Sequence, residues 1–113
     1  MLKGHLDLLL LAVLLPRPAH GYVIIEALRR CSGGTFDLPE GTVYPALHKL
    51  EMDGMLASEW SSETGRRRRV YAITEPGRAA FAAQRAEWSR FAQGIEAVLE
   101  EARRAEPVLE TVP

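Results

Sequence analysis

The segment SSETGRRRRVYAIT, residues 61–74, places four consecutive arginines, Arg66 to Arg69, between a polar stretch and a run of alternating apolar residues. In that run Tyr71 and Ile73 would share one face of an extended chain, and Leu56 to Trp60 alternates in the same way. The two stretches predict a β-hairpin with the arginines at its tip. A cationic hairpin tip is suited to binding phosphate groups.

The net charge of the whole chain gives no sign of a nucleic-acid binder. There are 14 Lys and Arg against 15 Asp and Glu, a net charge of -1 and a pI near 6.3. Residues 1–70 carry nine basic and eight acidic side chains, and four of those nine are the arginine run. Because phosphate attraction depends on the local field, the neutral total does not exclude DNA as a partner.

Length and composition point to a small domain of ordinary character. A chain of 113 residues predicts one domain with a modest core, for which help from a partner subunit is expected. A hydrophobic content of 47% and a charged content of 26% are typical of soluble proteins. The single cysteine, Cys31, allows no internal disulfide and fits a reducing cytosol, so we expect a cytoplasmic location.

An unbroken apolar run, Leu8 to Leu15, lies near the N-terminus. Eight residues cannot span a bilayer, which needs about 20, and the adjacent Asp7 does not fit a secretory signal. We therefore expect no membrane partner and interpret the run as part of a first helix, Leu2 to Leu15. A helix that is apolar on nearly all sides must be buried on nearly all sides, which points to a dimer core.

Two more helices are expected before the hairpin. The second would run from near Gly21 to Cys31, and the third would place Val43, Leu47 and Leu50 on one face. Gly54 is suited to cap the end of the third helix.

The start of the third helix is open between two alternatives. If Thr42 is the N-cap, Pro45 lies in the first turn, where its missing N–H does no harm. If Pro39 is the first helical residue, Pro45 distorts the helix locally.

A long final helix is predicted from Glu75 to about Arg104, with Thr74 as its cap and Pro76 in its first turn. Its apolar residues recur in heptads, which predicts a dimer interface. The residues assigned to that interface are Phe81, Trp88, Phe91, Ile95, Val98 and Leu99.

The element order indicates the fold: mainly α with a two-stranded β-wing, that is, a winged helix-turn-helix followed by a long C-terminal dimerisation helix. We expect the DNA-binding domain at residues 1–74, the dimerisation helix at 75–105 and a flexible tail at 106–113. In such a fold the third helix enters the major groove and the wing lies along the phosphates. The side of this helix away from the core offers Thr42, Tyr44, His48 and Lys49, which suit base edges and phosphates.

Three sequence blocks resemble the PadR family of transcriptional regulators over roughly residues 5–99. They are HGYVIIEALRR, GTVYPALHKLEMDGML, and GRRRRVYAIT followed by Pro76 and Gly77. The resemblance implies a homodimeric bacterial repressor that binds operator DNA, and the single terminal helix resembles the short-form subgroup. Carried across by position, it implies that Gly41, Thr42, Tyr44 and Pro45 belong to the recognition helix and Arg66, Arg68 and Arg69 to the wing.

The chain departs from the family pattern at two places. His48 and Lys49 stand where paired basic residues are common, and Arg67 adds a charge to the wing. The predicted DNA-binding residues are Thr42, Tyr44, Pro45, His48, Lys49, Arg66, Arg67, Arg68 and Arg69. Trp60 is expected to pack below the hairpin.

The resemblance also implies an effector, because short-form relatives bind flat hydrophobic compounds near the dimer interface. Trp88 and Phe91 are the candidates to contact an aromatic small molecule that releases the operator. Heptad core positions already explain both aromatic residues, and the effector contact stays open beside that interpretation.

Three other function classes have weaker signals in the sequence. A metal-responsive repressor of the same fold would use His5, His20, His48 or Cys31, but none has a dense ligand spacing, and Cys31 is expected to be a small buried residue. We predict no metal and no cofactor. No nucleophile elbow, phosphate loop or acid and base pair supports an enzyme. The remaining alternative is a winged-helix protein-interaction module that does not bind DNA.

Overall fold

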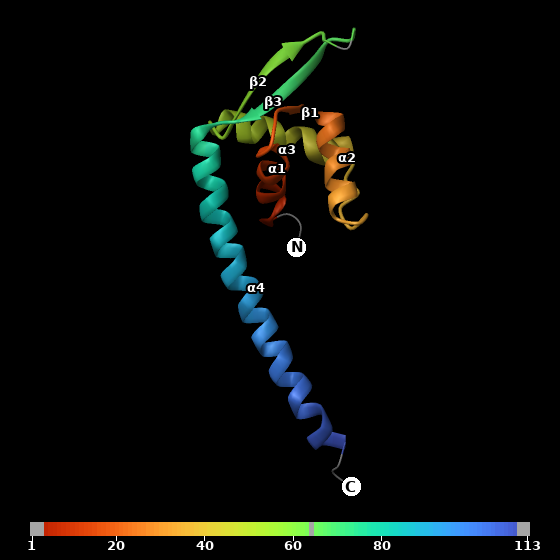
Figure 1. The fold of residues 1–113 in the computed structure, drawn as a ribbon, viewed down its shortest axis with the longest axis vertical. Coiled ribbons are helices and arrows are strands. Elements are labelled where there is room, and N and C mark those ends of the chain that lie inside the picture. The colour runs from red at the N-terminus through yellow and green to blue at the C-terminus, as the bar shows by residue number, and fades with distance from the viewer. Residues whose placement is uncertain (1–3, 64, 111–113) are drawn as a thin grey trace. The chain divides into compact units, whose positions relative to one another are not determined.

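The computed structural model describes residues 4–63 and 65–110 of the chain. The chain forms two compact units, Met1–Ala82, which we call the head, and Ala83–Pro113. The elements in chain order are α1 (Leu6–Leu14), β1 (Ala19–His20), α2 (Gly21–Cys31), α3 (Glu40–Met52), β2 (Leu56–Ser61), β3 (Arg68–Ile73) and α4 (Glu75–Glu110) (Figure 1). The predicted fold class is confirmed: three helices, a β-wing and a long C-terminal helix.

The core of the head is formed where α1, α2 and α3 meet the sheet. Its buried residues are Leu10, Leu11, Leu14, Ile24, Leu28, Val43, Leu47, Leu50, Leu56 and Tyr71. The predicted inner face of α3 is therefore confirmed. α1 ends at Leu14, and its Leu9 and Val13 are only half-buried, so the described residues of the head leave part of α1 uncovered.

Both helices of the helix-turn-helix end in the same glycine-dependent way. The N–H of Gly34 donates to the Arg29 carbonyl at 2.8 Å, and the N–H of Met55 donates to the Leu50 carbonyl at 2.9 Å. The residue after each cap has a positive φ, 61° at Gly33 and 81° at Gly54. Glycine adopts this conformation without a Cβ penalty, so the predicted role of Gly54 is confirmed.

The start of α3 differs from both alternatives. Pro39 is the N-cap residue, and the helix begins at Glu40. The N–H of Thr42 already donates to the Pro39 carbonyl at 3.0 Å, so Thr42 lies inside the helix and is not its cap. Pro45 is consequently an interior residue, and it cannot donate to the carbonyl of Gly41, four residues earlier.

The sheet has three antiparallel strands in the order β1-β3-β2, one more than predicted. β2 and β3 form the wing, which extends beyond α1–α3 (Figure 1). Its register places Ser58 opposite Tyr71 and Trp60 opposite Arg69. β1 adds two residues to the other edge of β3, with His20 opposite Val70.

Thr74 joins the end of α3 to the start of α4. Its Oγ1 accepts the N–H of Gly77 at 3.1 Å and donates to the Gly54 carbonyl at 2.6 Å, which confirms the predicted cap. A Cβ at Gly77 would overlap the backbone of Met55, so only glycine fits this close approach.

α4 runs to Glu110, past the predicted end near residue 105. Ion pairs three residues apart, Arg103 with Glu100 at 2.9 Å and Arg104 with Glu101, support the helix before Pro107. Residues 111–113 of the predicted tail lie outside the described residues. Within residues 4–63 and 65–110, no helix is both long and apolar enough to cross a membrane.

Candidate nucleic-acid interface

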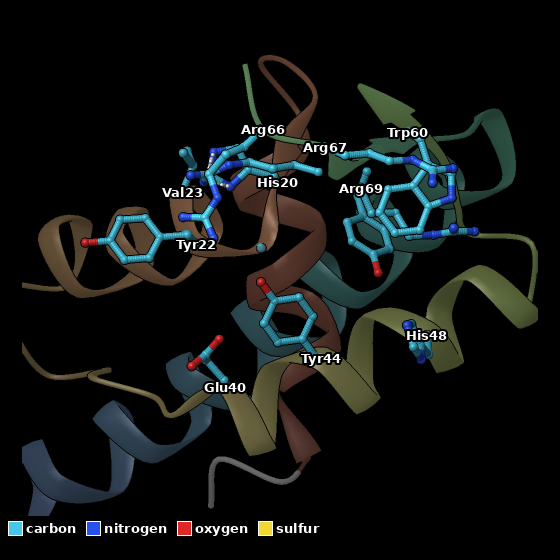
Figure 2. Close-up of a pocket in the computed structure, with 13 residues that line it drawn as sticks. His20, Tyr22, Val23, Glu40, Tyr44, His48, Trp60, Arg66, Arg67 and Arg69 are labelled. Atoms are coloured by element: carbon cyan, nitrogen blue, oxygen red, sulfur yellow. Dashed lines mark hydrogen bonds between the residues drawn. The ribbon is translucent and has the colours of Figure 1, made fainter. Parts of the chain in front are cut away.

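A groove of about 740 Å³ crosses one face of the head between the start of α2, the part of α3 from Glu40 to His48, and the wing. Figure 2 shows that side chains from all three elements face it. Its lining residues are His20, Gly21, Tyr22, Val23, Glu40, Tyr44, His48, Trp60, Arg66, Arg67, Arg68, Arg69 and Tyr71. The fold therefore brings the arginine run to the same groove as two of the predicted recognition residues, Tyr44 and His48.

Four of the predicted recognition residues are exposed on α3: Thr42, Pro45, His48 and Lys49. Their spacing of three to four residues places them along one side of the helix. Lys49 Nζ lies 3.1 Å from Asp53 Oδ2, but the two side chains are 73% and 50% exposed. An ion pair this exposed contributes little to stability, so Lys49 is not fixed to Asp53.

Tyr44 lies apart from those four residues. It is half-buried, and its ring extends from α3 toward the start of α2 (Figure 2). A Cβ at Gly21 would overlap this ring, so the glycine allows α2 and α3 to approach. The structure thus places Tyr44 in the packing between the two helices, with one edge at the groove.

Arg68 contacts a histidine on β1. Its Nη1 lies 3.2 Å from Nε2 of His20 and 3.4 Å from Nδ1, and the guanidinium can only donate, so the imidazole accepts. Burial, followed by the positive charge of Arg68, lowers the pKa of His20 below its ordinary value. This pair fastens β3 of the wing to β1, directly before the start of α2.

Arg69 belongs to a network of hydrogen bonds and an ion pair that reaches α3. Its Nε donates to Ser58 Oγ at 2.7 Å, and Ser58 Oγ donates to Glu51 Oε2 at 2.7 Å. Arg69 Nη2 also lies 3.7 Å from the same Glu51 oxygen. One carboxylate of α3 therefore holds both strands of the wing in place.

Arg66 and Arg67 are the exposed members of the run. The Arg67 guanidinium lies 4.5 Å from the centre of the Trp60 ring, and that of Arg69 lies 5.3 Å from it. Trp60 is 53% exposed, so it supports two arginines at the surface, whereas the sequence had predicted packing below the hairpin. Arg68 and Arg69 thus have partners within the head, whereas Arg66 and Arg67 stay at the surface of the wing.

In the second unit an apolar stripe is exposed along α4. Its large residues are Trp88, Phe91, Ile95, Val98 and Leu99, five of the six predicted interface residues. The Trp88 and Phe91 rings are 5.8 Å apart and inclined at 44°. A shallow hollow of about 420 Å³ follows the stripe from Arg90 to Leu99. Phe81, the sixth residue, is half-buried and packs against the core of the head.

The metal hypothesis gains no support from the described part of the chain. There, no three His, Cys, Asp or Glu side chains lie close enough together to hold a metal ion. His20 and His48 both line the groove, but as members of its polar wall. Cys31 is exposed, so the expectation that it is buried was wrong: it lies in the last turn of α2, where a glycine-rich turn follows and nothing covers it.

Two residues of this face were missed in the sequence: His20 lines the groove, and Met52 lines a hollow that shares His48, Trp60 and Arg69 with it. Met52 ends α3 and is 87% exposed on the side that carries Pro45 and Lys49. Met52 lies seven residues after Pro45 and three after Lys49, and this helical spacing is the signal that could have identified it. His20 contacts the arginine run only through the pairing of β1 with β3, which no local sequence pattern indicates.

In a comparison with known proteins, residues 10–83 match the family described as "Transcriptional regulator PadR-like family". The transcriptional regulator Rv3488 of Mycobacterium tuberculosis is 44% identical over 66 residues, and the match covers 58% of this chain and 59% of that one, less than two thirds of its length.

Solved structures agree in fold over most of the chain. A transcriptional regulator from Clostridium thermocellum is 28% identical, with a TM-score of 0.79 over 85% of this chain and 94% of its own. A PadR family transcription regulator from Clostridium difficile is also 28% identical, with a TM-score of 0.76 over 85% and 99% of the two chains.

Proposed function

The chain belongs to the PadR-like family of transcriptional regulators, and from that membership we propose that it is a sequence-specific DNA-binding repressor that acts as a homodimer. The observation that carries the proposal is the position of Arg66 and Arg67, exposed on the wing beside the exposed side of α3. Under this proposal the protein is a regulator and not an enzyme, and its access to DNA implies a cytoplasmic location.

In the proposed complex α3 enters the major groove and the wing follows the phosphates. Thr42, Pro45, His48 and Lys49 would face base edges, and Arg66 and Arg67 would neutralise phosphates. Arg68 and Arg69 would act indirectly, because their contacts to His20 and Glu51 hold the wing against the head.

The dimer would form through the apolar stripe of α4. A heptad stripe that carries Trp88, Ile95 and Val98 exposes large apolar area on one chain, and pairing with a second copy removes that area from water. We accordingly assign DNA binding to residues 1–74 and dimerisation to residues 75–105. The half-buried state of Leu9 and Val13 on α1 leaves room for further contact with the second copy.

Release from the operator is proposed to follow binding of an aromatic small molecule beside Trp88 and Phe91. The support is the exposure of both rings and the hollow that continues from Phe91. Titration of candidate aromatic compounds against a Trp60→Phe variant isolates the fluorescence of Trp88. Quenching with loss of operator binding supports the site, and unchanged fluorescence across the compounds contradicts it.

An electrophoretic shift with the DNA upstream of the protein's own gene tests the proposal. If a dimer neutralises about five phosphates, the log–log salt slope is near -4.5, and affinity falls several hundredfold between 50 and 200 mM salt. A shift at 50 mM that is lost at 200 mM is the expected result. No shift at 50 mM salt would favour a winged-helix module that binds another protein.

A further inference from the structure

The exposed side of α3 lacks the side chains that most often read bases. The helix sequence EGTVYPALHKLEM contains no Arg, Asn or Gln. These are the residues that form paired hydrogen bonds with guanine and adenine, although Lys also binds guanine. Apart from Glu40 and Tyr44 near the start of the helix, the hydrogen-bonding groups on this side are Thr42, His48 and Lys49.

Apolar groups make up much of what α3 exposes instead. Pro45 is exposed, and Met52 is 87% exposed. Seven residues are about two helical turns, so these two side chains lie on one side of α3 and about 10.5 Å apart along its axis. That distance matches about three base-pair steps of 3.4 Å. Thr42 adds a methyl group one turn before Pro45.

The carboxylates beside these apolar residues have partners within the head. Glu51 accepts from Ser58 and lies near Arg69, and Asp53 is paired with Lys49. Beside Met52 lies an open hollow of about 670 Å³, bordered by His48, Trp60 and Arg69. The flexible thioether side chain thus has room to adjust to the shape of a partner.

The major groove of DNA offers one apolar group, the C5 methyl of thymine. We propose that Pro45 and Met52 of α3 contact thymine methyl groups and so select half-sites with thymines about three base pairs apart. Lys49 and His48 lie between them and face the intervening base pairs. The inference rests on the proposed DNA-binding function and names the base that α3 selects.

The test begins with a binding site selected from a random duplex pool by the full-length protein at 50 mM salt. Each thymine of the selected half-site is then replaced, one at a time, by deoxyuridine, which lacks only the C5 methyl. Burial of one methyl-sized group is worth about 0.8 kcal/mol, so loss of a contacted methyl should weaken binding about fourfold. We expect two thymines about three base pairs apart to show this loss.

Two variants test whether the thymine preference comes from Met52. Met52→Gln keeps the length of the side chain but removes its apolar end, so it should abolish the thymine preference at one of the two positions only. Arg67→Ala should weaken binding to thymine and uracil duplexes by the same factor, because a phosphate contact carries no base information.

The outcomes separate the two proposals. Full affinity for every uracil duplex, with a defined selected site, overturns thymine reading and leaves DNA binding intact. A fourfold loss that persists in Met52→Gln at both positions overturns the role of Met52. Failure to select any site from the pool overturns the DNA-binding function and the thymine inference with it.

Discussion

Arg69 and Arg67 have the same side chain and lie two residues apart, yet their surroundings differ. Arg69 donates to Ser58 at 2.7 Å and lies beside the half-buried Glu51, whereas Arg67 stacks over the exposed Trp60. A hydrogen bond that involves a charged group contributes more to stability than a contact at the exposed surface. Arg69 therefore stabilises the head, and Arg67 remains at the surface, where the proposed contact with DNA would form.

Replacement of these two arginines should separate stability from binding. Arg69→Ala leaves Glu51 without its cation and should lower the free energy of unfolding by about 1 to 2 kcal/mol. Arg67→Ala, the matched control, should change it by less than about 0.5 kcal/mol, because its contact is exposed. Urea unfolding measures both. Equal effects from the two variants would contradict the division within the arginine run.

His20 makes the free energy of unfolding depend on pH. Burial and the neighbouring Arg68 lower its pKa, so the folded chain resists protonation of the imidazole. Above the ordinary histidine pKa of about 6.5, His20 is neutral in both the folded and unfolded chains. Below that pH the unfolded chain binds a proton more readily, so stability is lost as the pH falls.

We expect the free energy of unfolding to decline between pH 7 and pH 5.5, and a His20→Gln variant to show a shallower decline. Urea unfolding at several pH values measures both curves, and this window lies above the titration of ordinary carboxylates. Parallel curves for wild type and variant would show that Arg68 does not oppose protonation of His20.

At the scale of single residues, the sequence predicted the site only in outline. It identified the arginine run and the exposed residues Thr42, Pro45, His48 and Lys49. It could not distinguish Arg68 and Arg69 from their neighbours, because their partners His20 and Glu51 are distant in the chain. Tyr44 was assigned to the outer side of α3, but its ring packs against Gly21.

Among the elements, α3 carries an evident structural cost. Pro45 lies inside the helix, where proline removes a hydrogen bond to the Gly41 carbonyl and disfavours helix by about 3 kcal/mol. Proline partly offsets this by restricting the unfolded chain. Its presence on the exposed side of α3 suits a binding role, since no core residue depends on it.

Pro45→Ala should therefore raise the free energy of unfolding by about 1 to 2 kcal/mol while weakening binding to the operator. Thermal unfolding measures the first effect, and fluorescence anisotropy with labelled operator DNA measures the second. Ala46→Ser, at the next position but half-buried, serves as a control that should destabilise without a direct effect on DNA contact. A destabilised Pro45→Ala would mean that Pro45 serves the fold.

The sequence predicted the elements of the fold more completely than the site. Apolar spacing located α2 and the inner face of α3, and Thr74, Pro76 and Gly54 marked the ends of helices, because these signals are local. β1 was missed, since a two-residue strand is defined by its pairing with β3 and not by its own sequence. α4 was placed too short by a few residues, as is common for helix ends.

At the scale of the whole molecule, the proposed dimer depends on the stripe of α4. Val98→Glu places a charge in the interface, where an unpaired buried charge costs several kcal/mol. We expect the dissociation constant of the dimer to rise more than a hundredfold, with a parallel loss of operator affinity. Gln93→Glu adds the same charge off the stripe and should leave the dimer intact. Analytical ultracentrifugation measures both, and a dimeric Val98→Glu would contradict the interface.

The central claim is that the head binds DNA through α3 with Arg66 and Arg67 on the phosphates. The most direct test is a salt titration of operator binding by wild type and by the Arg66→Ala, Arg67→Ala double variant. If both arginines of both protomers neutralise one phosphate each, the double variant loses four contacts, and the log–log slope becomes shallower by about 3.6. An unchanged slope would contradict the claim.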